Sequence, residues 1–370
     1  MIKKLPKAND NVLKLNRLDD RGSDRNNIFR FDKNERTYPF RSELIKQILS
    51  DKINSNITMY PDQNNLYKML SKKLKIETEN ILLCAGSDAG LKHIFETYLS
   101  KEDTIIYLSP TYAMVEVYAN LYEIKKIKIE YNNENKISLK EIIEYLIKFK
   151  PKCFFIANPN QPTGTFISRN SIEKISNLCK KYSIIFVLDH AYFDFVPKNE
   201  QYKIENLITQ NPFLIVLNTF SKSYGLAGIR LGFLLSNKHN INKLYKVKSY
   251  ADINYFSIVF GLYFLKNKKI FNHHLFEVKK SKSFLKKEFS KFINYFEFID
   301  SYTNFIHLRF KSSKHLNEIY NFLKKKNIIV RINYQGLPAT IENSLRITIP
   351  SFNQAKLLIS NVKNFYKKYE

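Results

Sequence analysis

Residues 213–232 read FLIVLNTFSKSYGLAGIRLG, and this stretch predicts both the fold and the site. It begins with a continuous apolar run, residues 213–217, as expected for a strand that is buried on both faces of a sheet. Polar and small residues follow at once, among them Lys222 and Arg230. In open α/β sheets, ligands bind outside the carboxyl ends of the strands. The stretch therefore predicts a buried strand that delivers a lysine and an arginine to a binding site.

Three earlier apolar runs have the same form. They are TIIYL at 104–108, CFFIA at 153–157 and IIFVL at 184–188, and the residues that follow them are SPTY, NPNQPTGT and DHAY. Such runs alternate with helical segments from about residue 75 to 235, which predicts a mostly parallel sheet covered on both faces. Four successive strand ends are thus expected to meet at one site.

The C-terminal third follows a different pattern. A lysine-rich helical stretch over residues 267–292 precedes three strand-like segments, NFIHLRF, NIIVRI and SLRITI, with helices between and after them. This order predicts a separate α+β unit. We therefore expect an extended arm over residues 1–35, a large α/β domain over 36–260 and a small C-terminal domain over 261–370.

Composition excludes several classes of protein. Of the 370 residues 44% are hydrophobic, yet no window approaches the roughly 20 uninterrupted apolar residues of a membrane helix. The basic N-terminus has no apolar run after it, so it does not resemble a secretory signal, and we expect a cytoplasmic protein without a membrane span. Cys84, Cys153 and Cys179 have no Cys-x-x-Cys spacing, which indicates reduced core residues.

The formal net charge of +26 raises the question of polyanion binding. Because the lysines are spread along the whole chain, we interpret them as a bias in residue usage and expect no nucleic-acid partner. The charge is instead expected to help attract anionic substrates. The seven histidines show no His-x-x-His or His-Glu-x-x-His spacing, so no metal site is predicted.

The residues around Lys222 carry the chemistry. A lysine at a strand exit can form an imine with an aldehyde. The hydroxyls of Thr219 and Ser221 and the guanidinium of Arg230 can converge on a phosphate, and the glycines permit close approach of the backbone. Together these residues indicate a phosphorylated aldehyde cofactor.

The segment 221–232 resembles the cofactor-lysine signature of class I and II pyridoxal-phosphate aminotransferases, most closely the histidinol-phosphate group, and the likeness extends over most of the chain. The resemblance implies fold type I, with a mostly parallel seven-stranded sheet in the large domain. It implies pyridoxal 5'-phosphate as cofactor, bound through Lys222. It also implies transfer of an amino group between an amino acid, expected to be glutamate, and a small phosphorylated carbonyl compound, by a homodimer with shared active sites.

Asp189 ends the run IIFVLD, where a carboxylate can keep a pyridine nitrogen protonated. In the family the matching aspartate has this role, while the residue matching Tyr192 bonds the phenolic oxygen of the cofactor. The turn at 157–165, ANPNQPTGT, resembles the family's Asn-Pro-x-Asn-Pro-Thr-Gly loop, but Gln161 stands where asparagine is usual. Either Gln161 or Asn160 is expected to reach the phenolic oxygen, with a purely structural turn as the alternative.

Further positions match the cofactor site. In CAGSDAG at 84–90, a turn of small residues leads into a helix, whose first backbone N–H groups at Ser87 and Asp88 can bind a phosphate. Gly86 completes the family's Gly-x-Asp turn, although Ser and Asp are also common helix caps. Tyr112 matches the aromatic residue that stacks on the pyridine ring. Tyr60 matches a tyrosine that reaches the cofactor phosphate of the neighbouring subunit.

The substrate is expected to meet residues from three segments. Arg346 matches the arginine that binds the α-carboxylate, for which the planar guanidinium gives bidentate geometry. Arg331 resembles the arginine that binds the substrate phosphate, with a surface ion pair as the alternative. Asn34, in DKNERTYPF at 32–40, resembles the first asparagine of the Asn-Glu-Asn-Pro arm that lines the substrate pocket. Arg36 and Thr37 depart from that motif, so a phosphorylated ketone or a sugar-pathway intermediate is a further candidate acceptor.

Two other functions fit the same motifs. Threonine-phosphate decarboxylases resemble this group at nearly all the positions named, so decarboxylation of a phosphorylated amino acid is the main alternative. The bond at Cα that lies perpendicular to the cofactor ring decides between the two reactions. A non-catalytic protein that binds pyridoxal phosphate or a polyanion is the second alternative.

Overall fold

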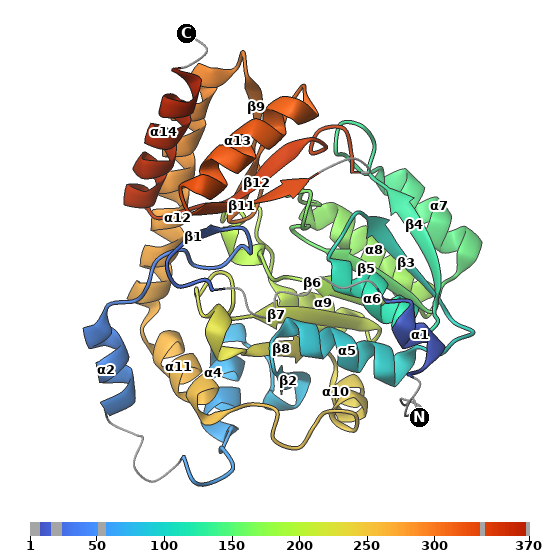
Figure 1. The fold of residues 1–370 in the computed structure, drawn as a ribbon. Helices are drawn as coiled ribbons and strands as arrows, with labels where there is room; N and C mark the ends of the chain where they lie inside the picture. The colour runs from blue at the N-terminus through green and yellow to red at the C-terminus, as the bar shows by residue number, and fades with distance from the viewer. Residues whose placement is uncertain (1–7, 16–23, 51–56, 334–336, 368–370) are drawn as a thin grey trace, which may run out of the picture.

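The structure is a computed structural model that describes residues 8–15, 24–50, 57–333 and 337–367. It contains a seven-stranded sheet and a five-stranded sheet, each covered by helices (Figure 1). The order of the larger sheet is β2-β8-β7-β6-β5-β3-β4. Its strands are β2 (Ile81–Cys84), β3 (Thr104–Ser109), β4 (Lys125–Glu130), β5 (Cys153–Ala157), β6 (Ile185–Asp189), β7 (Leu214–Thr219) and β8 (Gly232–Leu235).

Only β8 runs antiparallel to its neighbours in this sheet, and the other pairings are parallel. The four strands predicted from apolar runs are confirmed as β3, β5, β6 and β7, with ends that differ by at most two residues. Along β5, Phe154 and Ile156 enter the apolar core on one face, while Cys153 and Phe155 enter the core on the other. Burial on both faces explains why the runs are continuous rather than alternating.

The helices divide between the two faces of this sheet. One core is formed with α2 (Ser42–Ser50), α4 (Asn64–Leu74), α7 (Leu139–Phe149), α8 (Arg169–Lys181), α9 (Ile204–Gln210) and α11 (Tyr255–Lys266). The other is formed with α5 (Ser87–Tyr98), α6 (Ala113–Leu121) and α10 (Lys238–Tyr245). Short elements are α1 (Asp10–Leu13), η1 (Thr78–Asn80), η2 (Phe193–Phe195) and η3 (Ala227–Ile229). Helices on both faces leave the carboxyl ends of the parallel strands as the open edge.

The second sheet has the order β1-β11-β12-β10-β9. Its strands are β1 (Phe29–Phe31), β9 (Phe296–Ile299), β10 (Phe305–Phe310), β11 (Ile328–Asn333) and β12 (Ser344–Thr348). The helices of this unit are α12 (Lys268–Phe289), η4 (Ser290–Phe292), α13 (Ser313–Lys325) and α14 (Phe352–Tyr366). The three strand-like segments of the C-terminal third are thereby confirmed as β10, β11 and β12.

One strand of this sheet comes from the start of the chain. β1 pairs in parallel with β11, so that the blue N-terminal segment of Figure 1 lies beside red C-terminal strands. The core of the larger unit includes residues as far as Leu265, and the core of the smaller one contains Phe31 and then residues from Val278 onward. The N-terminal segment therefore passes from the small sheet towards the open edge of the large one.

Candidate active site

A cavity of about 690 Å³ lies between the two units, at the carboxyl ends of β3, β5, β6 and β7. It brings together thirteen of the residues predicted from the sequence, which come from all parts of the chain. These are Asn34, Ser87, Asp88, Tyr112, Gln161, Asp189, Tyr192, Thr219, Ser221, Lys222, Arg230, Arg331 and Arg346. The expectation that four strand ends meet at one site is confirmed by this lining.

One end of the cavity is built to bind an anion. The Oγ1 of Thr219 donates to the Oγ of Ser221 at 3.0 Å, and an Nη1 of Arg230 approaches the same Oγ at 3.4 Å. Helix α5 begins at Ser87, and the first backbone N–H groups of a helix have no partner within it. Hydroxyls, a guanidinium and helical N–H groups thus face one small volume, a set that suits a phosphate.

Two glycines keep this end compact. Gly86 has φ of 83°, and a Cβ there would lie 2.6 Å from an Nη2 of Arg230. At Gly232 a Cβ would lie 2.5 Å from the backbone nitrogen of Ser87. Any side chain at either position would push Arg230 or the start of α5 away. Gly86 is therefore needed for the geometry of this end, although its own atoms do not line the cavity.

The amine of Lys222 is held by the N-terminal segment. Its Nζ donates to the carbonyl oxygens of Lys33 at 3.1 Å and Asn34 at 3.2 Å. It also lies 5.6 Å from the centre of the Tyr192 ring. Both acceptors are backbone oxygens, and no carboxylate among the described residues forms an ion pair with the amine.

Asp189 lies at the end of β6 and is only 7% exposed. Burial raises its pKa to about 6, although the N–H of Ala191, 2.9 Å from Oδ1, and the charge of Lys222 act in the opposite direction. A buried carboxylate with a raised pKa gains stability from a cationic or N–H partner placed in the cavity. This is the property that a protonated pyridine nitrogen requires of its neighbour.

Tyr192 and Tyr112 have different partners. The Tyr192 hydroxyl accepts a hydrogen bond from Nδ2 of Asn34 at 2.9 Å. Asn34 is itself fixed by Thr348, whose Oγ1 accepts from its backbone N–H and donates to its Oδ1. The Tyr112 hydroxyl lies 3.4 Å from Oδ1 of Asp88, and burial raises the pKa of this phenol. Asn34 thus orients Tyr192, in addition to lining the cavity.

The turn at 158–165 places Gln161 and Asn160 differently. Gln161 lines the cavity. The buried amide of Asn160 instead donates to the Pro110 oxygen at 2.9 Å and to Oγ1 of Thr163 at 2.8 Å, and its Oδ1 accepts from Thr111. These three hydrogen bonds hold the Asn160 side chain within the turn. Of the two amides, Gln161 is the one that faces the space a cofactor would occupy.

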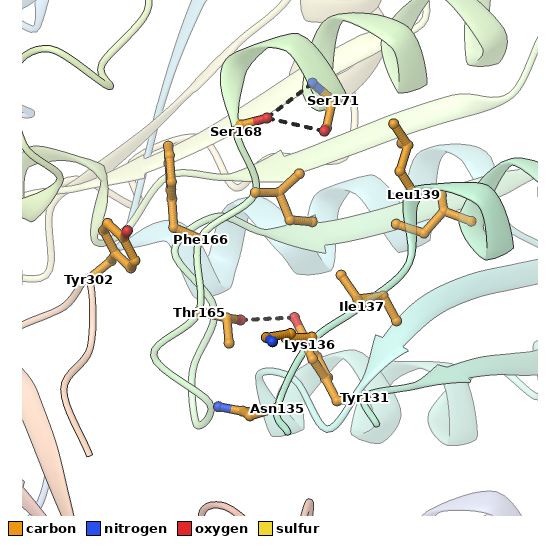
Figure 2. A pocket seen from close by; sticks show the side chains of 12 residues that line it. Tyr131, Asn135, Lys136, Ile137, Leu139, Thr165, Phe166, Ser168, Ser171 and Tyr302 are labelled. Atoms are coloured by element: carbon orange, nitrogen blue, oxygen red, sulfur yellow. Dashed lines mark hydrogen bonds between the residues drawn. The ribbon is translucent and has the colours of Figure 1, made fainter. Parts of the chain in front are cut away.

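The far side of the same turn borders a second cavity, of about 360 Å³ (Figure 2). There the Oγ1 of Thr165 donates to the Tyr131 hydroxyl at 3.2 Å, as the dashed line in the figure shows. Thr165 also bonds Thr163 at 2.8 Å. The turn is thus held from both sides, which fixes the direction of Gln161.

Arg331 and Arg346 are directly opposite each other on β11 and β12, so their side chains lie on the same face. Arg346 is 8% exposed and donates to the carbonyl oxygen of Asp32 at 2.9 Å. Burial, together with the charge of Arg331, lowers its pKa to about 10. Within the ranges that the structure describes, neither arginine forms an ion pair with a carboxylate. Two guanidinium groups side by side favour an anionic ligand.

The sequence model of the family described as Aminotransferase class I and II matches residues 26–359. The chain belongs to this family. The match confirms the resemblance stated above, the enzyme class of aminotransferase and the expected cofactor, pyridoxal phosphate. The seven-stranded sheet and the smaller second sheet confirm the expected fold class.

Individual relatives agree with the family. The chain is 32% identical to the histidinol-phosphate aminotransferase of Thermoanaerobacter pseudethanolicus, over 90% of this chain and 92% of that one. It is 28% identical to the dihydroxyacetone phosphate transaminase of Campylobacter jejuni, over 94% and 92% of the two chains. The fold matches the histidinol-phosphate aminotransferase of Sinorhizobium meliloti, solved in complex with pyridoxal-5'-phosphate, with a TM-score of 0.81 at 19% identity, covering 92% and 91%.

The residues of this aminotransferase fit its cofactor. Because Gly86 and Gly232 have no Cβ, the Arg230 guanidinium and the start of α5 can pack close together at the end of the cavity that suits a phosphate. The same cavity is lined by Lys222 and Asp189, which are the groups that an aldehyde and a ring nitrogen require.

Tyr60 lies outside this cavity. It is 76% exposed, and its ring packs edge-on against that of Tyr250 at 5.5 Å. A role at the active site of its own aminotransferase subunit is therefore not supported by the geometry. A role at the site of a neighbouring subunit, as implied by the resemblance, remains a prediction.

The departure at Arg36 and Thr37 lies outside the substrate cavity as well. The Arg36 guanidinium stacks on Tyr38 at 3.8 Å and on Phe40 at 4.1 Å. The Oγ1 of Thr37 donates to Gln354 at 2.8 Å, at the start of α14. Both residues fix the N-terminal segment, so this departure gives no indication of which substrate the aminotransferase accepts.

Sequence reasoning missed four groups near the site, two backbone carbonyls and two side chains. The backbone oxygens of Lys33 and Asn34 that bind Lys222 could not be found, because carbonyl groups leave no trace in a sequence. His307 and Asn333 could have been noticed, since each is a polar residue in a largely apolar strand segment.

Proposed function

We propose that this aminotransferase transfers the amino group of an amino acid, glutamate, to a small phosphorylated carbonyl compound. The pair of guanidinium groups at Arg331 and Arg346 carries the proposal. A substrate with a carboxylate or hydroxyl group near Arg346 and a phosphate near Arg331 would satisfy both. The names of the two relatives described above, which act on histidinol phosphate and dihydroxyacetone phosphate, support a phosphorylated substrate.

The cofactor would be held at three points. Thr219, Ser221, Arg230 and the start of α5 would bind its phosphate, Lys222 would hold it covalently, and Asp189 would bind its ring nitrogen. Once bound, pyridoxal phosphate supplies an electron sink for charge that develops at the substrate Cα. Tyr192 and Gln161 are the candidates for its phenolic oxygen, and Tyr112 for the ring face.

Each of the site residues has a definite task in such a reaction. The carboxylate of Asp189 keeps a proton on the ring nitrogen. The free, uncharged amine of Lys222 would take the proton that leaves the substrate Cα and would pass it to C4′ of the cofactor. The carbonyl oxygens of Lys33 and Asn34 hold the amine at the cavity. Arg346 fixes the substrate carboxylate and thereby the bond at Cα that is broken.

A substrate panel tests this proposal. The purified protein would be loaded with pyridoxal phosphate and given glutamate with a phosphorylated ketone as acceptor, either dihydroxyacetone phosphate or the ketone that corresponds to histidinol phosphate. Formation of 2-oxoglutarate is the expected result. Release of carbon dioxide from threonine phosphate, without formation of a keto acid, would instead assign decarboxylation.

Arg331→Ala tests the phosphate site within the same assay. The KM for a phosphorylated acceptor should rise about tenfold or more, because a charged hydrogen bond is lost, while the KM for glutamate changes little. Arg309→Ala is the matched control, because Arg309 contacts Glu297 and the oxygen of Ala339 rather than the cavity. Equal effects of Arg331→Ala on both substrates would contradict a phosphate site there.

We further propose a homodimer in which Tyr60 completes the site of the neighbouring subunit. Support comes from an exposed apolar group formed by Ile57, Met59, Tyr60 and Tyr250. Mixing the inactive variants Tyr60→Ala and Lys222→Ala should then restore activity that neither has alone, because each mixed dimer contains one intact site. The absence of restored activity in a proven mixed dimer would refute a shared site.

A location in the cytoplasm is part of the same proposal. Among the described residues, no helix is long and apolar enough to cross a membrane. Fractionation of cells of the source organism is the direct measurement.

A further inference from the structure

His307 lies on β10 of the small unit, and its side chain is fully buried at the boundary with the large unit. Its Nε2 lies 2.9 Å from the carbonyl oxygen of Pro162, in the turn that carries Gln161. A carbonyl can only accept, so Nε2 carries a proton. Burial lowers the pKa of His307 to about 3, so the ring is neutral and Nδ1 has no proton. The tautomer is thus determined by the partner of Nε2.

The partners of Nδ1 follow from this tautomer. Two donors are close, Nδ2 of Asn333 at 3.2 Å and Oγ of Ser344 at 3.1 Å. The Ser344 hydroxyl donates to the oxygen of Ile341 at 2.6 Å, which uses its only hydrogen. Asn333 therefore supplies the hydrogen bond to Nδ1, and its second amide hydrogen goes to Ser344 at 3.1 Å.

The two sides of the ring thus contact two different walls of the active site. On the Nε2 side is the turn whose Gln161 faces the cofactor space. On the Nδ1 side is the end of β11, whose Arg331 and Asn333 both line the cavity. The same boundary carries a backbone bond from the N–H of Tyr302 to the oxygen of Gly164 at 2.8 Å, which bonds the two units but does not reach β11.

We propose that His307 is a positioning residue that fixes the turn carrying Gln161 relative to the end of the strand carrying Arg331. Through His307, the distance between Gln161 in the large unit and Arg331 in the small unit is kept constant. This role rests on the proposed function, because the distance between Gln161 and Arg331 matters only if Gln161 faces the cofactor and Arg331 binds the substrate phosphate. It concerns a residue that touches neither group.

Two substitutions separate the two bonds. In His307→Gln the amide nitrogen reaches the position of Nε2 and can still donate to Pro162, but the acceptor at Nδ1 is lost. In His307→Asn the amide oxygen lies near the position of Nδ1 and can accept from Asn333, but nothing reaches Pro162. A third variant, Asn333→Ala, removes the donor to Nδ1 without changing the histidine.

Two readouts report on the two walls. Hydrogen exchange in the cofactor-free protein, for peptides covering 158–167, reports on the turn. It should be about five to ten times faster in His307→Asn than in wild type, and unchanged in His307→Gln and Asn333→Ala. The KM for the phosphorylated acceptor, relative to that for glutamate, reports on Arg331. It should rise about fivefold to tenfold in His307→Gln and Asn333→Ala, and little in His307→Asn.

The crossed pattern is what distinguishes positioning from packing. If both histidine variants change both readouts alike, or neither readout changes, the inference is wrong while the proposed function stands. If the histidine variants do not fold, Asn333→Ala decides alone, since a normal KM ratio in that variant overturns the inference. A wild-type protein that takes up no pyridoxal phosphate would overturn the proposed function, and the inference with it.

Discussion

Replacing Asp189 by asparagine should make the cofactor-free protein more stable while removing its activity. The pKa of Asp189 is raised from 3.8 to about 6, mainly by burial. Each pKa unit corresponds to about 1.4 kcal/mol, so the ionised carboxylate destabilises the folded chain by about 3 kcal/mol at pH 7.5. Asparagine removes this charge, and its Oδ1 can still accept from the N–H of Ala191.

The gain in unfolding free energy from Asp189→Asn should be larger at high pH than at low pH. The folded state binds the proton of Asp189 more tightly than the unfolded state, so wild-type stability falls as the pH rises from about 4 through 6. At pH 5 Asp189 is protonated in most folded wild-type molecules, and the advantage of Asp189→Asn should shrink to about 1.5 kcal/mol.

Urea unfolding of the cofactor-free proteins at pH 7.5 and pH 5 measures both differences in unfolding free energy, provided that this free energy falls with urea concentration equally steeply in the two proteins. The control is Glu144→Gln, which removes an exposed carboxylate on α7 and should change stability by less than about 0.5 kcal/mol. Saturation with pyridoxal phosphate should reverse the order of the two proteins, because only wild type gains a partner for Asp189. An Asp189→Asn protein no more stable than wild type, or equally stabilised at both pH values, would refute the reasoning.

Three further predictions concern other parts of the site. Arg346→Lys should raise the KM for glutamate about tenfold or more at nearly unchanged stability, since a lysine cannot form two parallel hydrogen bonds with a carboxylate; steady-state kinetics measure it. Gly232→Ala should weaken pyridoxal-phosphate binding strongly, because its Cβ would lie 2.5 Å from the Ser87 nitrogen; fluorescence titration would show a normal Kd if this is wrong. Thr37→Val should cost about 1 kcal/mol of unfolding free energy by breaking the contact with Gln354, and kcat should stay within about twofold.

The parallel part of the fold could be predicted because its signal is local. Each buried strand is an apolar run, and the polar residues after it mark the open edge of the sheet. Lys222, Asp189 and Gln161 lie within five residues of the ends of such runs, so the sequence predicts them together, and they do line one cavity. The predicted roles of these residues towards the cofactor remain predictions.

Contacts between units could not be predicted in this way. Asn34 bonds Tyr192, which is 158 positions away in the chain. No periodicity encodes such a pair, because it depends on how the N-terminal segment crosses between the two sheets. The same reason explains why Asn160 was a candidate equal to Gln161: neighbouring amides differ only in the direction that the folded turn gives them.

The three-residue strand β1 can pair with its partner strand only late in the synthesis of the chain. Its partner residues in β11 begin at Ile328, about 300 positions after Phe29. At a ribosomal rate of about 5–20 residues per second, β1 waits about 15–60 s for its partner to emerge. The carbonyl oxygens that bind Lys222 follow β1 directly, so they too are fixed only at the end. The nascent large unit can thus form its sheet early, while its reactive lysine acquires its final surroundings last.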